Sequence, residues 1–527
     1  MVISPGGISA QDLPAGDDFR VNTYGGSYQS SPLVSWTGDD SFVVVWQSRN
    51  QDGDGLGAFA RRYNSSGGPL GDEFRVLEET VGSQSVSDIA ATRDGAFLVV
   101  WSSRSAPLDD DDEVGGQFFD AAGGRVGEAF YIPSQVVADQ SRGRAVATGV
   151  GEAFYAAWDD DLADSSQRGL RGRRFDTAGA AVGGFFEVNT STLFAQRVVD
   201  VAQGANGEVL IVWLSGHLGP STSAVFGRRF DNRGVPLTGE IQLSDGTGLV
   251  RNADLAVDDS GDFVVVWTVG RNAFGRRFDS TGAAEAPSFQ VDQATLASVD
   301  RFAVAGDGEG NFVVVWDALY DADGDDQGIV ARRFDANGES VGHAFVVNTY
   351  TTGRQQNPDV ASDRFGNFVV SWEGPFGGSN SFRPIARRFA TNRISGQVFI
   401  DADGDGLRGP TESPLALTRV SLLDAAETVL RSVETRADGT YSFGVLPSAT
   451  DLTVRFEPSA DWAFTAADAG DDALDSDADP ATGEAPAVQV AAGEIVTGVD
   501  AGLLPVGGLL IDGFESGDAG AWDETFP

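Results

Sequence analysis

The sequence contains no cysteine and no lysine, one methionine and only two histidines, His217 and His343. A chain without cysteine forms no disulfide, has no thiol nucleophile and binds no zinc through thiolates. Two histidines so far apart in the sequence do not make a multi-histidine metal site. There is also no run of about 18 apolar residues, so we expect no membrane-spanning helix.

Basic charge is scarce as well, since 36 arginines face 78 acidic residues and the formal net charge is −42. Binding to nucleic acid requires a basic surface, so this balance excludes nucleic acid as a partner. The same acidity favours solubility, a divalent cation as ligand, or a high-salt environment. An apolar fraction of 41% with 34 phenylalanines provides for folded cores and excludes a disordered acidic chain.

A large chain rich in glycine and aspartate but free of cysteine is typical of an exported bacterial protein. We therefore expect an extracellular or cell-surface location and a monomer. Residues 1–18 contain neither a basic n-region nor an apolar h-region, so no signal peptide is visible in the chain. We expect these residues to form an N-terminal leader segment.

The dominant feature of the sequence is a repeat of about 55 residues. A short apolar run that ends in tryptophan occurs seven times, at Trp46, Trp101, Trp158, Trp213, Trp267, Trp316 and Trp372. In six of the seven repeats an arginine pair before an aromatic residue follows, as in Arg276-Arg277-Phe278. A Phe-x-Val element and a weaker strand such as Asp254–Val257 complete the unit.

Four short strands per repeat predict a propeller blade, and seven repeats predict a seven-bladed β-propeller over residues 19–392. The Phe-x-Val strand that begins at Phe19 can complete the last blade and close the ring. An open solenoid is the alternative. In their Gly-x-Phe-Val-Val-x-Trp strand and Arg-Phe-Asp strand, the repeats resemble uncharacterised propeller-like repeats of exported bacterial proteins, which implies a fold but no activity.

The repeats offer few candidates for chemistry. We expect the tryptophans to pack between blades and the arginine pairs to form ion pairs with loop aspartates; a ring of arginines that grips an anionic ligand is the alternative. The loop with Asp321, Asp323 and Asp325 alternates carboxylates as a calcium ligand set does, although Arg332 occupies position twelve. No sialidase Asp box and no Ser-His-Asp order is present, so no catalytic residue is assigned, while a carboxylate pair for glycoside hydrolysis stays open.

The composition changes after Phe389, and an alternating strand over 394–400 runs into a second acidic loop. This loop has Asp401, Asp403 and Asp405 at positions 1, 3 and 5, glycine at position 6 and Glu412 at position 12. Leu407 can add its carbonyl oxygen. The pattern is that of a calcium loop, in which the glycine permits the turn and the glutamate binds through two oxygens.

Four features in chain order together resemble the SdrD B-like domain. They are the acidic loop, the strand ending Leu422-Leu423-Asp424, the run Ala437-Asp438-Gly439-Thr440-Tyr441 and the acidic cluster after Asp471. The resemblance covers 393–503 and implies an Ig/prealbumin-like β-sandwich of bacterial surface proteins, stiffened by calcium. Asp475 and Asp477 would line a further site. Such domains usually occur in tandem, and this chain has one; related modules that form Lys–Asn crosslinks are excluded by the absence of lysine.

Residues 504–527 are predicted to be a linker and a C-terminal tail. The run Gly513-Phe514-Glu515-Ser516-Gly517-Asp518 resembles a short segment at the C-terminus of exported bacterial proteins. A role in sorting is one interpretation, and a terminus without function is the other.

These features predict a secreted or cell-surface protein that binds an extracellular glycan or protein without catalysis, with Ca²⁺ as a structural ion. One alternative is an extracellular hydrolase or lyase that acts on a polysaccharide or glycoprotein at the propeller face. The other is a structural scaffold within a surface assembly.

Overall fold

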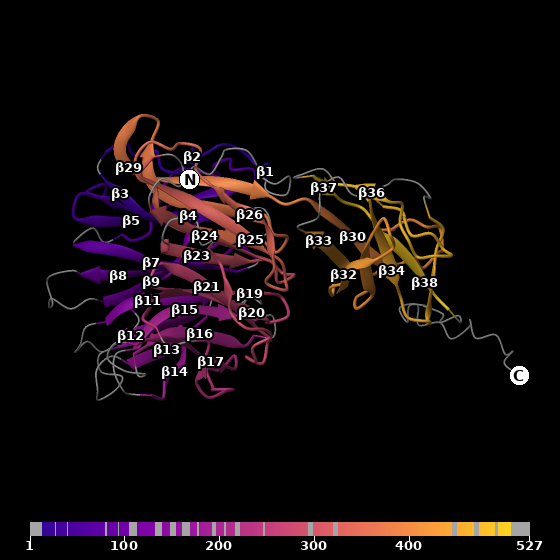
Figure 1. Ribbon diagram of the computed structural model, residues 1–527, viewed down its shortest axis with the longest axis horizontal. Coiled ribbons are helices and arrows are strands. Elements are labelled where there is room, and N and C mark those ends of the chain that lie inside the picture. Colours follow the sequence, from indigo (N-terminus) through magenta and orange to yellow (C-terminus); the bar gives the residue numbers. More distant parts are fainter. Residues whose placement is uncertain are drawn as a thin grey trace, which may run out of the picture. The chain divides into compact units, whose positions relative to one another are not determined.

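The computed structural model describes residues 13–506, except for 27, 39–40, 79–81, 93, 105–112, 132–139, 148–153, 161–168, 177–178, 192–195, 205–206, 217–221, 246–247, 293–298, 320–324, 445–450, 468–473 and 491–493. The described residues form strands and turns and contain no helix, which confirms an all-β chain. None of them therefore forms a helix that could cross a membrane. The chain divides into two compact units, Met1–Thr391 and Asn392–Pro527, and each is described by itself (Figure 1).

Within its described residues, the N-terminal unit consists of seven antiparallel sheets that follow one another along the chain. The first four sheets are β3 (Gln29–Trp36), β4 (Ser41–Arg49), β5 (Leu56–Asn64) and β6 (Phe74–Arg75); β7 (Ser83–Ala91), β8 (Phe97–Arg104), β9 (Glu113–Phe119) and β10 (Arg125–Tyr131); β11 (Gln140–Ala147), β12 (Phe154–Asp160), β13 (Gly169–Phe175) and β14 (Ala181–Glu187); and β15 (Gln196–Gln203), β16 (Val209–Ser215), β17 (Ala224–Phe230) and β18 (Ile241–Gln242).

The other three sheets are β19 (Val250–Val257), β20 (Phe263–Val269), β21 (Asn272–Phe278) and β22 (Phe289–Gln290); β23 (Val299–Gly306), β24 (Phe312–Leu319), β25 (Gln327–Phe334) and β26 (Ser340–Val346); and β27 (Gln356–Ser362), β28 (Phe368–Phe376) and β29 (Ser379–Ala390), joined by β1 (Leu13–Pro14) and β2 (Phe19–Arg20). The first strands of the sheets, β3, β7, β11, β15, β19, β23 and β27, are called the inner strands below. Each inner strand contacts the next, and β27 contacts β3. The arrangement is propeller-like.

The repeated tryptophans lie at the interfaces between successive sheets. All seven are at most 1% exposed. Trp101 of β8 packs with Val43 and Val45 of the preceding sheet, and Trp267 of β20 packs with Val212 of β16. The same relation recurs around the unit, so the expectation that these side chains pack between sheets is confirmed. Burying a tryptophan between two sheets removes a large apolar surface from water, which holds neighbouring sheets together.

The first and last sheets of this unit are joined by the same contacts as their neighbours in sequence. Trp46 packs against Val369 and Ala386 of the last sheet. The backbone N–H of Val34 donates to Oδ2 of Asp359 at 2.7 Å. At the N-terminus, Phe19 pairs with Ala386 of β29, as the repeat spacing predicted.

The arginine pairs serve the interfaces in a way that the sequence did not indicate. Arg228 donates to the carbonyl oxygen of Val188 at 3.1 Å, Arg332 does so to Val291 at 2.7 Å, and the guanidinium of each lies over the aromatic ring two residues later. The expected ion pairs with acids form at the second arginine in some repeats, as between Arg277 and Glu285 at 3.1 Å, and at the first arginine in the last sheet, where Arg387 lies 3.7 Å from Asp18. The first arginine therefore serves as a hydrogen-bond donor to backbone and a cap over an aromatic ring.

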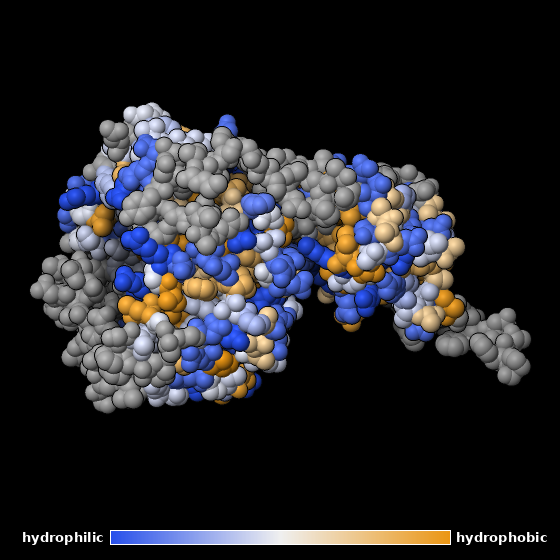
Figure 2. All heavy atoms as spheres, viewed as in Figure 1, coloured by the Kyte–Doolittle hydropathy of each residue, from blue (hydrophilic) through white to orange (hydrophobic). Residues whose placement is uncertain are grey.

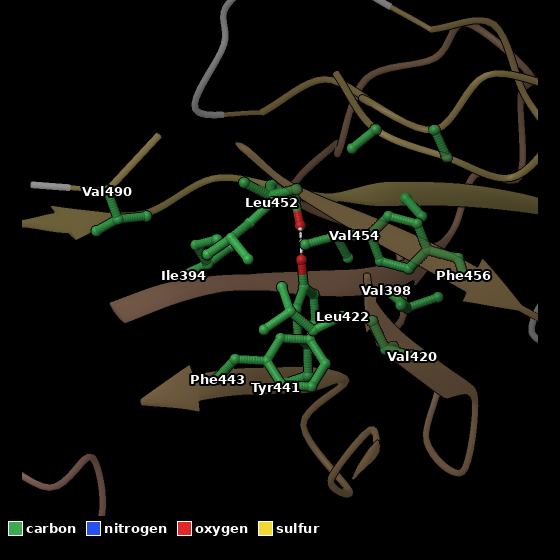
Figure 3. Close-up of a cluster of buried hydrophobic side chains, with 14 of the residues drawn as sticks. Ile394, Val398, Val420, Leu422, Tyr441, Phe443, Leu452, Val454, Phe456 and Val490 are labelled. Atoms are coloured by element: carbon green, nitrogen blue, oxygen red, sulfur yellow. Dashed lines mark hydrogen bonds between the residues drawn. The ribbon is translucent and has the colours of Figure 1, made fainter. Parts of the chain in front are cut away.

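The C-terminal unit has two sheets that enclose one core. One contains β33 (Thr440–Gly444), β30 (Arg393–Ile400), β38 (Ala501–Pro505) and β35 (Trp462–Phe464), with β37 (Ile495–Val496) paired to β30; the other contains β32 (Val429–Glu434), β31 (Arg419–Asp424), β34 (Asp451–Glu457) and β36 (Val488–Gln489). Buried side chains from both sheets, among them Ile394, Tyr441, Leu422 and Leu452, point toward one another (Figure 3). The hydroxyl of Tyr441 donates to the carbonyl of Val499 at 2.6 Å, so the one polar group of this buried side chain has a hydrogen-bond partner.

Hydrophilic residues cover much of the visible face of both units, and hydrophobic residues form smaller patches among them (Figure 2). This distribution accords with the net charge of −42. Many aspartates are used within hairpin turns. Asp279, for example, accepts the hydroxyl of Thr281 at 2.6 Å and the N–H groups of Thr281 and Ala283, each at 2.9 Å. The hydroxyl first, and then the N–H groups, lower the pKa of its carboxyl group. Such acids are structural parts of turns.

Candidate functional sites

The acidic loop after β30 brings three carboxylates together. Asp401 is fully buried at the end of the strand, while Asp403 and Asp405 are exposed. One carboxylate oxygen from each lies within 4.8 Å of the others, and no other such group of three or more occurs among the described residues. This spacing suits one hard cation that takes several oxygen ligands.

The loop is shaped by its own backbone amides. Asp401 accepts the N–H of Gly404 at 2.7 Å with Oδ1 and that of Gly406 at 2.8 Å with Oδ2. Asp405 accepts the N–H of Leu407 at 2.8 Å. Both glycines have positive φ, +74° and +80°, which side chains with a Cβ rarely adopt. The amides orient the carboxylates, so the loop is preformed.

Glu412 has a different environment from the three aspartates. Its Oε1 accepts the N–H of Ala402 at 2.7 Å, and its Oε2 accepts that of Gly409 at 2.8 Å. Oε1 therefore ties the end of the loop to its start, and Oε2 closes the turn that precedes Glu412. Glu412 as a bidentate calcium ligand and the carbonyl of Leu407 as a further ligand stay predictions.

The second predicted acidic cluster lies beside this loop. Asp475 is buried and pairs by a β-bridge with Leu407. The N–H of Ser476 donates to the carbonyl of Gly406 at 3.0 Å, so the segment is fastened to the loop. Asp477 stands slightly further along and accepts the N–H of Asp500 at 2.6 Å. No local pattern indicates that these two segments meet, because Asp475 lies 70 positions after Asp405.

Asp500 completes the charged group next to the loop. Burial raises the pKa of its carboxyl group to about 6, and Asp475 adds to the rise, while the N–H of Gln397 and the charge of Arg408 oppose it. Arg408 lies 3.4 Å from its Oδ2. Asp500 was not predicted as a site residue, and it has no motif around it that would have identified it.

The predicted calcium loop of the N-terminal unit is described only in part. Asp321 and Asp323 lie outside the described residues. Asp325 is exposed and accepts the N–H of Gly353 at 3.0 Å and that of Asp326 at 3.1 Å. A calcium site at this loop stays a prediction.

A cavity of about 660 Å³ lies among the inner strands of the N-terminal unit. It is lined by residues of β3, β7, β15, β19, β23 and β27, and is called the inner-strand cavity below. Four aspartates line it, Asp88, Asp200, Asp254 and Asp359. Each lies opposite the residue that precedes a repeated tryptophan, so the four share one register.

The backbone explains why this register faces the cavity. Each inner strand has a register shift just before this position, and such a bulge redirects the side chains that follow it. The remaining sheets have Leu33, Arg144 and Ala303 at the same register. The side chain of Arg144 lies outside the described ones.

Two of the four aspartates also link neighbouring sheets. Asp254 accepts the N–H of Val304 at 2.9 Å, as Asp359 accepts that of Val34. Burial raises the pKa of Asp359 to about 7; Asp254 and Asp88 contribute to the rise, and backbone N–H groups oppose it. The sequence contains a signal for this site, the recurring Asp-x-Ala of the inner strands, but only the packing of successive inner strands shows that these aspartates share a cavity.

Comparison with known proteins concerns mainly the C-terminal unit. Residues 392–503 match the model of the SdrD B-like domain family, which confirms the resemblance predicted over 393–503. The chain is 31% identical over 134 residues to "Serine-aspartate repeat-containing protein E" of Staphylococcus aureus strain Mu50 / ATCC 700699, over 22% of this chain and 11% of that protein. The protein of the same name in strain Newman is 31% identical over 129 residues, which are 21% of this chain and 11% of the relative. The chain thus spans about a tenth of the length of these relatives.

Solved structures similar to the N-terminal part have low sequence identity. A protein of unknown function from Dyadobacter fermentans DSM 18053 is 11% identical with a TM-score of 0.44, covering 72% of this chain and 99% of that one. The Dos1 propeller is 9% identical with a TM-score of 0.40, covering 72% and 94%. The polysaccharide lyase Uly1 is 10% identical with a TM-score of 0.43, covering 72% and 98%. Because these TM-scores are below 0.5, the description of the N-terminal fold depends on its own strand pairing and not on these structures.

Proposed function

We propose that this chain is a secreted or cell-surface protein that binds calcium and an extracellular glycan or protein without catalysis. In this proposal the N-terminal unit is a closed seven-bladed β-propeller, and the C-terminal unit is an Ig/prealbumin-like β-sandwich stiffened by Ca²⁺. The observation that carries the proposal is the convergence of the Asp401, Asp403 and Asp405 carboxylates in one loop.

The donor set of this loop suits calcium for chemical reasons. Its ligands are carboxylate oxygens, and the cysteines or paired histidines that would favour zinc are absent from the unit. Two unit charges 4.8 Å apart repel by about 0.9 kcal/mol even in water, so three such carboxylates oppose the loop by about 2.6 kcal/mol. A bound cation removes this repulsion and adds attraction. Calcium therefore stabilises the folded unit by mass action.

A calorimetric experiment on the full chain tests the calcium site. Thermal unfolding is recorded with EDTA and with calcium, for the wild type and for Asp403→Ala. At a calcium concentration about 100-fold above the Kd, we expect about 2.7 kcal/mol of stabilisation, which for a unit of this size raises the unfolding midpoint by about 10 °C or more.

The control is Glu434→Ala, which removes an exposed carboxylate of β32 in the same unit. It should keep the calcium response, while Asp403→Ala should lose most of it. A C-terminal transition that ignores calcium in the wild type would contradict the proposal.

The proposed location and binding role rest on other features. The absence of cysteine, the acidic surface and the SdrD B-like domain support an extracellular or surface setting. Antibody labelling of intact cells against permeabilised cells tests it, because a surface protein is labelled in both. Labelling only after permeabilisation would refute the location.

A second candidate function is glycoside hydrolysis or a related reaction in the inner-strand cavity. It is favoured by the raised pKa of Asp359, about 7, beside the other carboxylates of the cavity. Glycosidases use such a pair, one carboxyl group protonated and one ionised. Release of reducing ends from polysaccharide substrates, abolished by Asp359→Asn, would support this function over the non-catalytic one.

A further inference from the structure

We infer that the inner-strand cavity binds a neutral saccharide, through its aspartates as acceptors and a neighbouring set of arginines and asparagines as donors. The inference rests on the binding role proposed above, and assigns to it a site and a ligand class. None of the residues involved was recognised from the sequence as a binding residue.

The cavity offers donors and acceptors at adjacent levels. The acceptors are the four aspartates that share one register. Two or three residues before that register, the inner strands place Arg197, Asn252, Arg301 and Asn357 on the same cavity. A sugar hydroxyl donates one hydrogen bond and accepts others, so a polyhydroxylated ring placed between these levels can satisfy both.

The volume and the lining restrict the class of ligand. A cavity of about 660 Å³ is within the range of small-molecule sites, roughly 300–1,000 Å³. An apolar ligand would displace the water that contacts the aspartate, arginine and asparagine side chains of the cavity. The hydrogen bonds to that water would then be lost without replacement, which costs binding free energy. A hydroxyl-rich ligand replaces the hydrogen bonds of that water.

Two other classes of ligand, anionic sugars and a single metal ion, fit this lining less well. Four aspartates against Arg197 and Arg301 disfavour an anionic sugar such as a uronic acid. A single directly bound metal ion is also disfavoured, because the described residues bring three carboxylates within 4.8 Å only at the loop of Asp401. No three aspartates of the cavity come that close together, so they do not form a three-carboxylate set for one ion.

The site is held in place before any ligand arrives. Asp254 and Asp359 are fixed by backbone N–H groups of the next inner strand, Val304 and Val34. Asn357 is fixed by donating its side-chain amide to Glu373 at 2.7 Å. A preformed site loses less conformational entropy on binding, which favours the modest contacts that a neutral sugar makes.

Isothermal titration calorimetry of the full chain tests the inference. The probes are cellotetraose, maltotetraose and chitotetraose as neutral sugars, with tetragalacturonic acid as the anionic one. We expect at least one neutral tetrasaccharide to bind at least tenfold more tightly than the anionic one. Loss of charged or bidentate hydrogen bonds in Arg301→Ala or Asn252→Ala should weaken that binding about tenfold.

Arg251→Ala is the matched control, since Arg251 is an exposed neighbour of Asn252 that does not line the cavity. It should bind like the wild type. Asp200→Asn keeps the shape of the cavity and is a second variant in case the alanine variants unfold, which thermal unfolding reveals. Its affinity for the neutral sugar should also fall.

Three results would overturn the inference. They are no binding of any neutral probe, tighter binding of the anionic probe, or equal binding by wild type and cavity variants. In the last case the binding role survives at another surface, so the two failures are distinguishable. The calcium response of Asp403→Ala is scored separately and is independent of all three.

Discussion

Replacing Glu373 by alanine should weaken the junction between the last and first sheets of the N-terminal unit. Glu373 is fully buried in β28, and its carboxylate accepts three hydrogen bonds of 2.6–2.7 Å. The donors are the backbone N–H of Ser31 in the first sheet and the side-chain amides of Gln356 and Asn357. Ser31 has a φ of +51°, so this carboxylate also holds an unusual backbone conformation in place.

The cost follows from what the alanine leaves behind. These three donors lose their acceptor in a buried place, at roughly 1–3 kcal/mol each. The hydroxyl of Tyr28, which donates to Oε1 at 3.4 Å, is exposed and can turn to water, and partial access of water to the cavity side reduces the sum. We expect about 3 kcal/mol. For a unit of this size a loss of 1 kcal/mol shifts the midpoint by roughly 1–2 °C, so the N-terminal transition should fall by about 3–5 °C.

Differential scanning calorimetry of the full chain measures this shift. Glu373→Gln keeps one acceptor oxygen and should fall between alanine and wild type. Glu339→Ala removes an exposed carboxylate in the turn before β26 and should change the midpoint by less than about 1 °C. The C-terminal transition should not move in any variant. If Glu373→Ala shifts the N-terminal transition no more than Glu339→Ala does, the junction is not held in this way.

Two further predictions concern pH and backbone packing. Asp359 titrates near pH 7 in the folded chain but near 4 when unfolded, so the folded state binds an extra proton between these values, and the N-terminal unit should lose up to about 4 kcal/mol as pH rises from 4 to 7. Calorimetry across this range checks the slope, which Asp359→Asn should remove; a stability that rises with pH through this window would contradict the assignment. Gly396→Ala would place a Cβ 1.8 Å from the carbonyl oxygen of Val499, so it should lower the free energy of unfolding of the C-terminal unit by about 3 kcal/mol or more. Gly71→Ala is the control, because open space surrounds that position, and it should change the free energy of unfolding little. Chemical denaturation measures both changes. A Gly396→Ala chain as stable as the wild type would show that the strand can move to accept the methyl group.

Local patterns in the sequence predicted much of the fold. The apolar runs before Trp101 and Trp267 are buried strands, because a β-branched run is stable only when both of its faces are covered. The spacing of the Phe-x-Val elements predicted that the strand at Phe19 pairs with the last sheet. The spacing of acids predicted that Asp401, Asp403 and Asp405 meet in one loop, because six neighbouring residues that include two glycines can bring these side chains together without help from the rest of the chain.

Features that depend on distant segments were beyond such patterns. Asp88 and Asp359 share a cavity only because successive sheets bring their inner strands together, and in the sequence they are two of 78 acids. The arginine pairs were expected to bind acids, but the first arginine of four pairs reaches a backbone carbonyl of the preceding sheet; these are Arg61, Arg228, Arg332 and Arg387. That partner is about 40 residues earlier, as Val188 is for Arg228. A charge count cannot indicate such a partner, because any carbonyl serves equally well.

The junction between the first and last sheets has a consequence for synthesis of the chain. The inner strand β3 meets β27 across more than 300 residues, and β2 has no partner until β29 is made. The strands β1 and β2 therefore wait, unpaired, through most of translation, while β3 pairs early with β4 but lacks its neighbour from the last sheet. Contacts of such long range slow folding, and strand edges left open meanwhile invite pairing with other chains. A chain of this design gains its full resistance to proteolysis only after its seventh repeat has emerged.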